Sequence, residues 1–281
     1  MRSASVATLA SLPLFMMGCF SADITVKLNP DGSGTIVQRL MVNSSLRVQM
    51  KTMMSGFAKQ GGEPQIPAGS SKLIGLFDEG EARAQATKMG EGVSFVSSRE
   101  VKTDTMEGRE SVYAFNDIRQ LKISEKPGSS TLQGMGTVQE GTSGKETVFR
   151  FQKLESGHAL LTIVSPIAQH NERSETVAEP KSKPGAPSPE QLEQARRMFE
   201  GMRFSLVIDV QGSVIHTNSP YLDGSRVTIL EMDFSQLLSN ENLLKEMSSM
   251  KSDSLEDARN FLKNVKGFRV NLEPEVQVEF R

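Results

Sequence analysis

The chain has 281 residues, of which 37% are hydrophobic, and its 32 Lys and Arg residues face 34 Asp and Glu residues, for a formal net charge of −2. This length allows one large or two small domains with a real hydrophobic core. Because the charge is nearly balanced, the composition gives no electrostatic argument for binding nucleic acid or for binding anionic lipid through charge.

The first nineteen residues combine a basic residue, a short apolar run and the one cysteine of the chain. Arg2 precedes the apolar run 4–17. That run is shorter than the roughly 20 residues that a membrane-spanning helix needs, and it has the length of a signal-peptide core. It ends in Met-Met-Gly18-Cys19. The pattern predicts an export signal over 1–18 and a mature chain that begins at Cys19.

This ending resembles the lipobox of bacterial lipoproteins, in which Gly or Ala precedes the cysteine. The resemblance implies lipid on the sulfur of Cys19, cleavage between Gly18 and Cys19, and acylation of the new amino terminus. Phe20 follows in place of an Asp, which by the same resemblance favours the outer membrane of a diderm host. The expected partner is therefore a membrane, reached through the lipid. A cysteine buried in an N-terminal helix is the alternative.

Alternation of apolar and polar residues over 23–42 predicts a β-hairpin. Its turn carries oxygen-bearing side chains at Asn29, Asp31 and Ser33 and resembles the first half of an EF-hand calcium loop. Such a loop needs a carboxylate at its twelfth position, where this chain has Leu40, and helices on both sides. We expect a plain hairpin turn, with calcium at these three residues as the alternative.

The strand, the Asp31-Gly32-Ser33-Gly34 turn and the second strand follow the lipobox directly. Over 23–45 this arrangement resembles the LppM-type lipoprotein domain of bacteria. The resemblance implies an α+β fold and no established catalytic activity.

A helix is predicted over 45–60, where apolar residues recur at three- and four-residue spacings. Its stripe includes Met50 and Met54, and such a stripe fits either the hydrophobic core or a surface for a hydrophobic ligand. Acidic residues at the start predict a second helix over 78–89. The same reading predicts strands over 93–101 and 110–115 with a turn between them, and a second hairpin formed by strands over 147–154 and 158–164.

Proline and charged residues without an apolar stripe predict a disordered linker over 166–189. Beyond it the pattern predicts helices over 190–202, 235–250 and 255–266. It also predicts a strand pair over 203–216, a strand over 226–233 and a final hairpin or bent strand over 268–281. The linker divides the mature chain into a first lobe, 19–165, and a second lobe, 190–281, which we expect to share one sheet.

The expected fold is α+β, an antiparallel sheet with several helices packed on one face. Two short echoes suggest two related halves. The segment 113–121 resembles 230–237, and the hairpin 24–42 resembles a strand, turn and strand over 204–217. Chance recurrence of common strand-to-helix sequences is the alternative.

The residues that carry chemistry are few. The three histidines, His158, His170 and His216, have no metal-binding spacing, and no nucleophile elbow or phosphate-binding loop is present. The densest polar cluster is 216–219, read as a polar turn. We therefore predict no cofactor and a non-catalytic binding or structural module of the cell envelope, with an envelope protein as the kind of partner. An envelope hydrolase near His216 and a carrier of lipid or another hydrophobic ligand are the alternatives.

Overall fold

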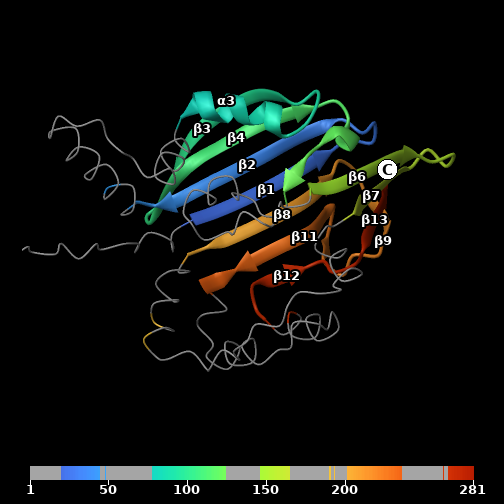
Figure 1. Cartoon of the computed structure of the whole chain (residues 1–281). Coiled ribbons are helices and arrows are strands. Elements are labelled where there is room, and N and C mark those ends of the chain that lie inside the picture. Colours follow the sequence, from blue (N-terminus) through green and yellow to red (C-terminus); the bar gives the residue numbers. More distant parts are fainter. Residues whose placement is uncertain are drawn as a thin grey trace, which may run out of the picture.

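The computed structural model describes residues 20–44, 78–124, 146–164, 201–235 and 265–281, together with the single residues 48, 190, 193 and 262. These residues form two β-sheets and a helix (Figure 1). The larger sheet has the strand order β10-β11-β8-β1-β2-β4-β3, with β12 also paired to β11, and the second sheet has the order β5-β6-β7-β13-β9.

The elements are β1 (Phe20–Leu28), β2 (Gly34–Asn43), α3 (Glu79–Lys88), β3 (Ser94–Lys102), β4 (Met106–Phe115), the 3-10 helix η1 (Ile118–Gln120), β5 (Ile123–Ser124), β6 (Glu146–Lys153), β7 (Ala159–Val164), β8 (Arg203–Val210), β9 (Val214–Thr217), β10 (Leu222–Asp223), β11 (Arg226–Asp233), β12 (Phe268–Val270) and β13 (Glu275–Phe280).

Strand β1 lies near the centre of the larger sheet, with β2 antiparallel on one side and β8 parallel on the other. Every second residue of β1 is buried, as the sequence alternation predicts for a strand with one face on the core. The buried side chains from Ile24 to Leu28 pack with the corresponding face of β8, which carries Leu206 and Ile208. The other face of β1 carries polar side chains.

The hydrophobic core lies between the two sheets. Phe149 of β6, Leu161 of β7 and Phe280 of β13 are buried and belong to the same cluster as Ile24 and Ile208 of the larger sheet. Ala86 of α3 and Met89 at its end belong to the same cluster, so within the described residues the apolar face of the larger sheet is covered by the second sheet and, toward β3 and β4, by α3.

Helix α3 lies along β3 and β4 at one edge of the larger sheet (Figure 1). Asp78 caps its start, where the side chain accepts a hydrogen bond of 2.7 Å from the amide of Gly80. The Tyr113 hydroxyl of β4 donates a hydrogen bond of 3.1 Å to the carbonyl of Ala82, and the Arg83 guanidinium lies 4.4 Å from the ring centroid of Phe95. These contacts hold the predicted helix 78–89 on the sheet.

The predicted α+β class, with several helices on one face of a single sheet, is wrong. The described fold is mostly β, in two sheets, and α3 is the one complete α-helix within the described ranges. The physical reason is that β6, β7 and β13 cover much of the apolar face on which helices were expected, and α3 covers only the part toward β3 and β4. The larger sheet is also mixed, because β1 and β8 run parallel within otherwise antiparallel neighbours.

The local hairpins are confirmed, whereas the predicted pairing of later strands is wrong. The hairpins β1–β2, β3–β4 and β6–β7 form as the sequence predicts. The strand pair over 203–216 does not form, because β8 pairs with β1 and β11 while β9 pairs with β13. The hairpin 24–42 therefore has no counterpart at 204–217, and this echo does not make two related halves.

The segment 268–281 likewise divides between the sheets, with β12 paired to β11 and β13 paired to β7 and β9. Each sheet therefore contains strands from both sides of 166–189. The predicted linker itself, and nearly all of the predicted helices 45–60, 190–202, 235–250 and 255–266, lie outside the described residues. The same holds for Met50 and Met54.

We predict that Gly34→Ala destabilises the protein by about 2–3 kcal/mol, because a Cβ there would overlap the Lys27 carbonyl oxygen and lie 2.6 Å from Phe115 Cζ. The matched control is Gly92→Ala. Gly92 has a φ of +74° but no atom within 4 Å of its added Cβ, so that variant tests backbone strain alone at about 1 kcal/mol. Urea unfolding of both variants measures the difference, and equal losses would contradict the close packing at Gly34.

Candidate functional site

The predicted lipid-attachment residue directly precedes the first strand of the larger sheet in the sequence, and this boundary is called the junction below. Gly18 and Cys19 are outside the described residues, and β1 begins at the next residue, Phe20. Phe20 pairs with Val42 of β2, and from Ser21 onward β1 is also paired with β8. No residue separates Cys19 from a strand that is hydrogen-bonded on both sides.

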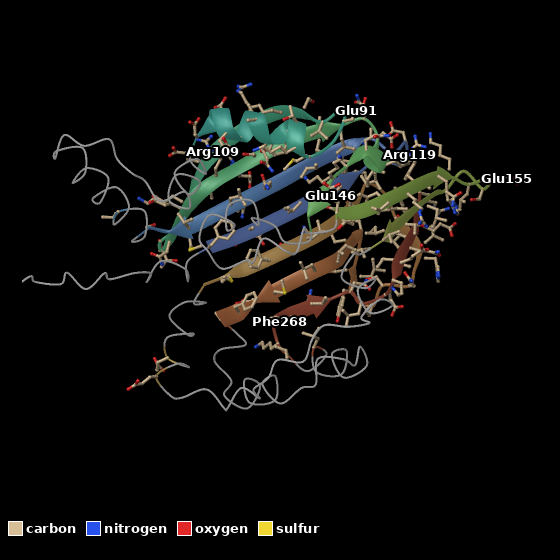
Figure 2. All side chains as sticks on the ribbon, viewed as in Figure 1. Glu91, Arg109, Arg119, Glu146, Glu155 and Phe268 are labelled. Carbon is tan, nitrogen blue, oxygen red and sulfur yellow. The ribbon has the colours of Figure 1, made fainter. Side chains whose placement is uncertain are left out.

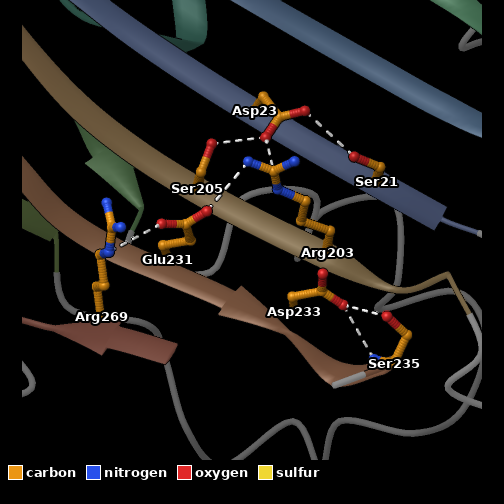
Figure 3. Close-up of polar contacts among 8 residues, drawn as sticks. All are labelled: Ser21, Asp23, Arg203, Ser205, Glu231, Asp233, Ser235 and Arg269. Atoms are coloured by element: carbon orange, nitrogen blue, oxygen red, sulfur yellow. Dashed lines mark hydrogen bonds and ion pairs between the residues drawn. The ribbon is translucent and has the colours of Figure 1, made fainter. Parts of the chain in front are cut away.

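A polar network lies on one face of the sheet close to this junction (Figure 3). Asp23 of β1 accepts hydrogen bonds from the hydroxyls of Ser205, at 2.6 Å, and Ser21, at 3.2 Å. The Arg203 Nε lies 3.7 Å from the same Asp23 carboxylate. The network therefore ties the start of β1 to the start of β8.

The same network continues onto β11 and β12. Arg203 donates a hydrogen bond of 3.1 Å from its Nη2 atom to Glu231, whose other carboxylate oxygen lies 3.7 Å from Arg269 Nε. The end of β11 is closed by Asp233, which accepts a hydrogen bond of 3.0 Å from the amide of Ser235. Asp23 and Glu231 are paired with Arg203 and Arg269 from β1 to β12, and Asp233 is a third carboxylate whose hydrogen bonds come from Ser235.

Across β2, β4 and β3 the same face carries a second charged group. Glu110 of β4 lies between Arg39 and Arg99, at 2.5 and 2.7 Å, and its side chain is only 12% exposed. The hydrogen bond from Arg39, followed by that from Arg99, lowers the pKa of the Glu110 carboxyl below its ordinary value of 4.5 against the opposing effect of burial. Register places Arg99, Glu110, Arg39 and Asp23 in one row across four strands.

On the opposite face, aromatic rings connect the start of β1 to β12. Phe20 packs on Phe204 with ring centroids 6.1 Å apart, Phe204 on Phe234 at 6.2 Å, and Phe234 on Phe268 at 5.5 Å. The last two pairs meet edge to face, a favourable geometry for aromatic rings. The junction is therefore held by polar groups on one face and by rings on the other.

The three candidate calcium ligands form a closed hydrogen-bonded turn. Asp31 Oδ1 accepts hydrogen bonds from the Ser33 amide, at 2.9 Å, and the Ser33 hydroxyl, at 2.6 Å, and Asn29 donates to the same hydroxyl at 3.0 Å. These hydrogen bonds from Ser33 lower the pKa of the Asp31 carboxyl. Two strands flank the turn, as expected for a hairpin and not for an EF-hand.

The polar cluster 216–219 is built into the edge of the second sheet. His216 is exposed on β9, opposite Glu279 of β13. The Thr217 hydroxyl donates to the Gln277 carbonyl at 2.6 Å, and the buried Ser219 hydroxyl accepts a hydrogen bond of 3.0 Å from Asn271. These hydroxyls fasten the loop to β13 and its neighbours, and neither contacts His216 to form a nucleophile and base.

His158 faces a single carboxylate at the end of the second sheet. The His158 Nδ1 atom lies 2.6 Å from a carboxylate oxygen of Glu279, across the β7–β13 pairing. No group of three or more metal-ligating side chains occurs within the described ranges. In those ranges there is also no helix with the length and apolarity to cross a membrane. His170 lies outside them.

Sequence reasoning missed the polar network and the ion pairs of Glu110. The signal that could have found Asp23 is its position on the polar side of an alternating strand. Nothing in the sequence indicates its partner Ser205, because the two residues are 182 positions apart. The same is true of Arg39 and Glu110, which are 71 positions apart.

Comparison with known proteins finds no matching family model and no matching curated protein sequence. Among solved structures, the NMR structure of the folded domain of the Mycobacterium tuberculosis LppM protein is similar at a TM-score of 0.33. The alignment has 8% sequence identity and covers 97% of this chain and 95% of that chain. A likeness at this level establishes neither a shared fold nor a shared function.

We predict that Glu110→Gln costs about 1–3 kcal/mol of unfolding free energy at neutral pH, because Arg39 and Arg99 lose their shared carboxylate. The pKa of Glu110 is lowered by folding, so its ionised form stabilises the native state above the ordinary value of 4.5, and this contribution is lost as the pH falls through the lowered value. The difference in unfolding free energy between Glu110→Gln and the wild type is therefore expected to decrease as the pH falls below 4.5 and through the lowered pKa.

Urea unfolding across a pH series measures this effect. The matched control is Glu79→Gln, which removes one exposed ion pair with Arg83 on α3 and is expected to cost no more than about 0.5 kcal/mol. A gap for Glu110→Gln that stays constant down to acid pH would contradict the assigned ion pairs.

Proposed function

We propose that the mature protein is a lipid-anchored, non-catalytic binding or structural module of the bacterial cell envelope, attached to the membrane through Cys19. The observation that carries this proposal is the position of Gly18-Cys19. The pair ends a signal-like apolar run and stands directly before the first residue of β1. In this proposal the signal is removed on export, and the mature chain folds into the two-sheet structure in the cell envelope.

The chemistry of the anchor is consistent with a stable attachment. Each buried CH₂ of an acyl chain contributes about 0.8 kcal/mol, so two or three chains on one residue hold a protein on a membrane where a single chain does not. The Phe20-Ser21 pair after the cysteine, in place of an Asp, favours the outer membrane if the host is diderm.

The arrangement of polar groups supports a non-catalytic role. Ser219 and Thr217 are engaged in hydrogen bonds that fasten a loop to the second sheet, and His216 is exposed on the edge strand β9. This argues against the hydrolase alternative, which needs a nucleophile within reach of a base. The carrier alternative depends on Met50 and Met54, which are outside the described residues.

We predict that the N-terminal peptide of the purified mature protein begins at Cys19 and carries the mass of attached acyl chains. Mass spectrometry of this peptide is the measurement. In Cys19→Ser the signal is expected to remain uncleaved and without lipid, because the sulfur that accepts the lipid is absent. Gly18 and the rest of the signal stay intact in this variant, and an unmodified Cys19 in the wild-type protein would overturn the proposal.

A further inference from the structure

The larger sheet determines where a chain anchored at Cys19 would meet the membrane surface, because β1 begins at the next residue. Phe20 is 3% exposed and is paired with Val42, so the residue after Cys19 has no conformational freedom of its own. A flexible tether of n residues has a reach of about 5–6 Å times the square root of n. Here the number of tether residues between Cys19 and the sheet is zero.

The register of the larger sheet shows which other segments lie at the same end as Phe20. Val42 pairs with Glu107 of β4, and Glu107 with Lys102 of β3, so the β3–β4 turn around Asp104 lies beside the start of β1. The opposite end contains the end of β1 at Leu28. Eight residue steps of β1 separate the two ends by about 26 Å.

The β6–β7 turn lies at that opposite end. Gly32, in the turn after β1, lies against the ring of Phe151 of β6, and Glu155 follows beyond β6 in the turn. Figures 1 and 2 show this turn, with Glu155 labelled, projecting from the side of the molecule away from the start of β1. Glu91, before β3, lies toward the same end, because Ser94 pairs with Ala114 near the close of β4.

We infer that the anchored protein is held in one orientation, with the end of the larger sheet formed by Phe20, the β3–β4 turn and the start of β8 against the bilayer surface. The β6–β7 turn is then directed away from the membrane. This inference rests on the proposed function, since it needs lipid on Cys19. The partner of this end is a lipid surface, and the direct connection of the anchor to β1 enforces the contact.

The charges at this end indicate that anionic lipid is not required. The described residues there include Lys102, Arg203 and Lys266 with Asp104, Glu107 and Asp233, three positive and three negative groups. The balanced charge of these described residues gives no electrostatic preference for an anionic over a neutral bilayer. The orientation should therefore be the same on both.

A fluorescent label can be attached at one chosen position, because the chain has one cysteine and lipid would occupy the thiol of that cysteine. Asp104→Cys and Glu155→Cys, both at exposed turn positions, each introduce one free thiol for a fluorescent label. The lipidated full-length variants are placed in vesicles of phosphatidylcholine that carry a quencher on the lipid headgroup. We predict severalfold stronger quenching of the label at position 104 than of the label at position 155.

A second pair, Lys102→Cys and Glu91→Cys, repeats the comparison at other exposed positions of the two ends and covers the failure of one variant to fold. A Gly/Ser linker of about twelve residues between Cys19 and Phe20 gives a tether with a reach of about 20 Å and should remove the difference. Adding phosphatidylglycerol to the vesicles should leave the difference unchanged.

The outcomes separate the inference from the proposed function. Thiol labelling of the wild-type protein would show that Cys19 is unmodified and would overturn both. Equal quenching at 104 and 155 with Cys19 lipidated would overturn the orientation alone. A difference that survives the linker, or that arises only with phosphatidylglycerol, would also overturn it, because the direct connection would not then be its cause.

Discussion

The parallel pairing of β1 with β8 is the interaction on which the rest of the structure depends. It joins residues 20–28 to residues 203–210 and places the two strands side by side in the larger sheet. The remaining strands of that sheet add by antiparallel pairing, β2 on β1 and β11 on β8. Because parallel strands cannot be joined by a tight turn, this pairing requires a long connection, and here most of the chain lies between the two strands.

The pairing also determines how the second sheet is built. Strands β9 and β13 follow β8 in the chain but leave the larger sheet to pair with each other and with β7. Their inner residues Val278 and Phe280 are fully buried in the core shared by both sheets. Since each sheet needs strands from before and after 166–189, neither part of the chain contains a complete sheet by itself.

Sequence periodicity identified most strands and the hairpins whose partners are adjacent. The alternation in β1 and β2, and in β6 and β7, specifies which residues face the core, and short turns specify the partner. The same alternation in β8 and β9 led to a wrong hairpin, because period-2 alternation gives the face of a strand and not its neighbour. For the candidate site, Cys19 and its context are readable from sequence, whereas the pairing that holds Phe20 becomes visible only in the sheet.

The start of β1 is the end of a strand and is also firmly held, two properties that usually conflict. A strand end normally frays, because its last pairs are held from one side only. Here Asp23 is bound by Ser205 and faces Arg203, while Phe20 packs on Phe204, so both faces of the strand resist opening within four residues of its start. If the first pairs opened, the residues released would become a tether for the proposed anchor, so the same contacts that stabilise the sheet set how firmly the domain is oriented.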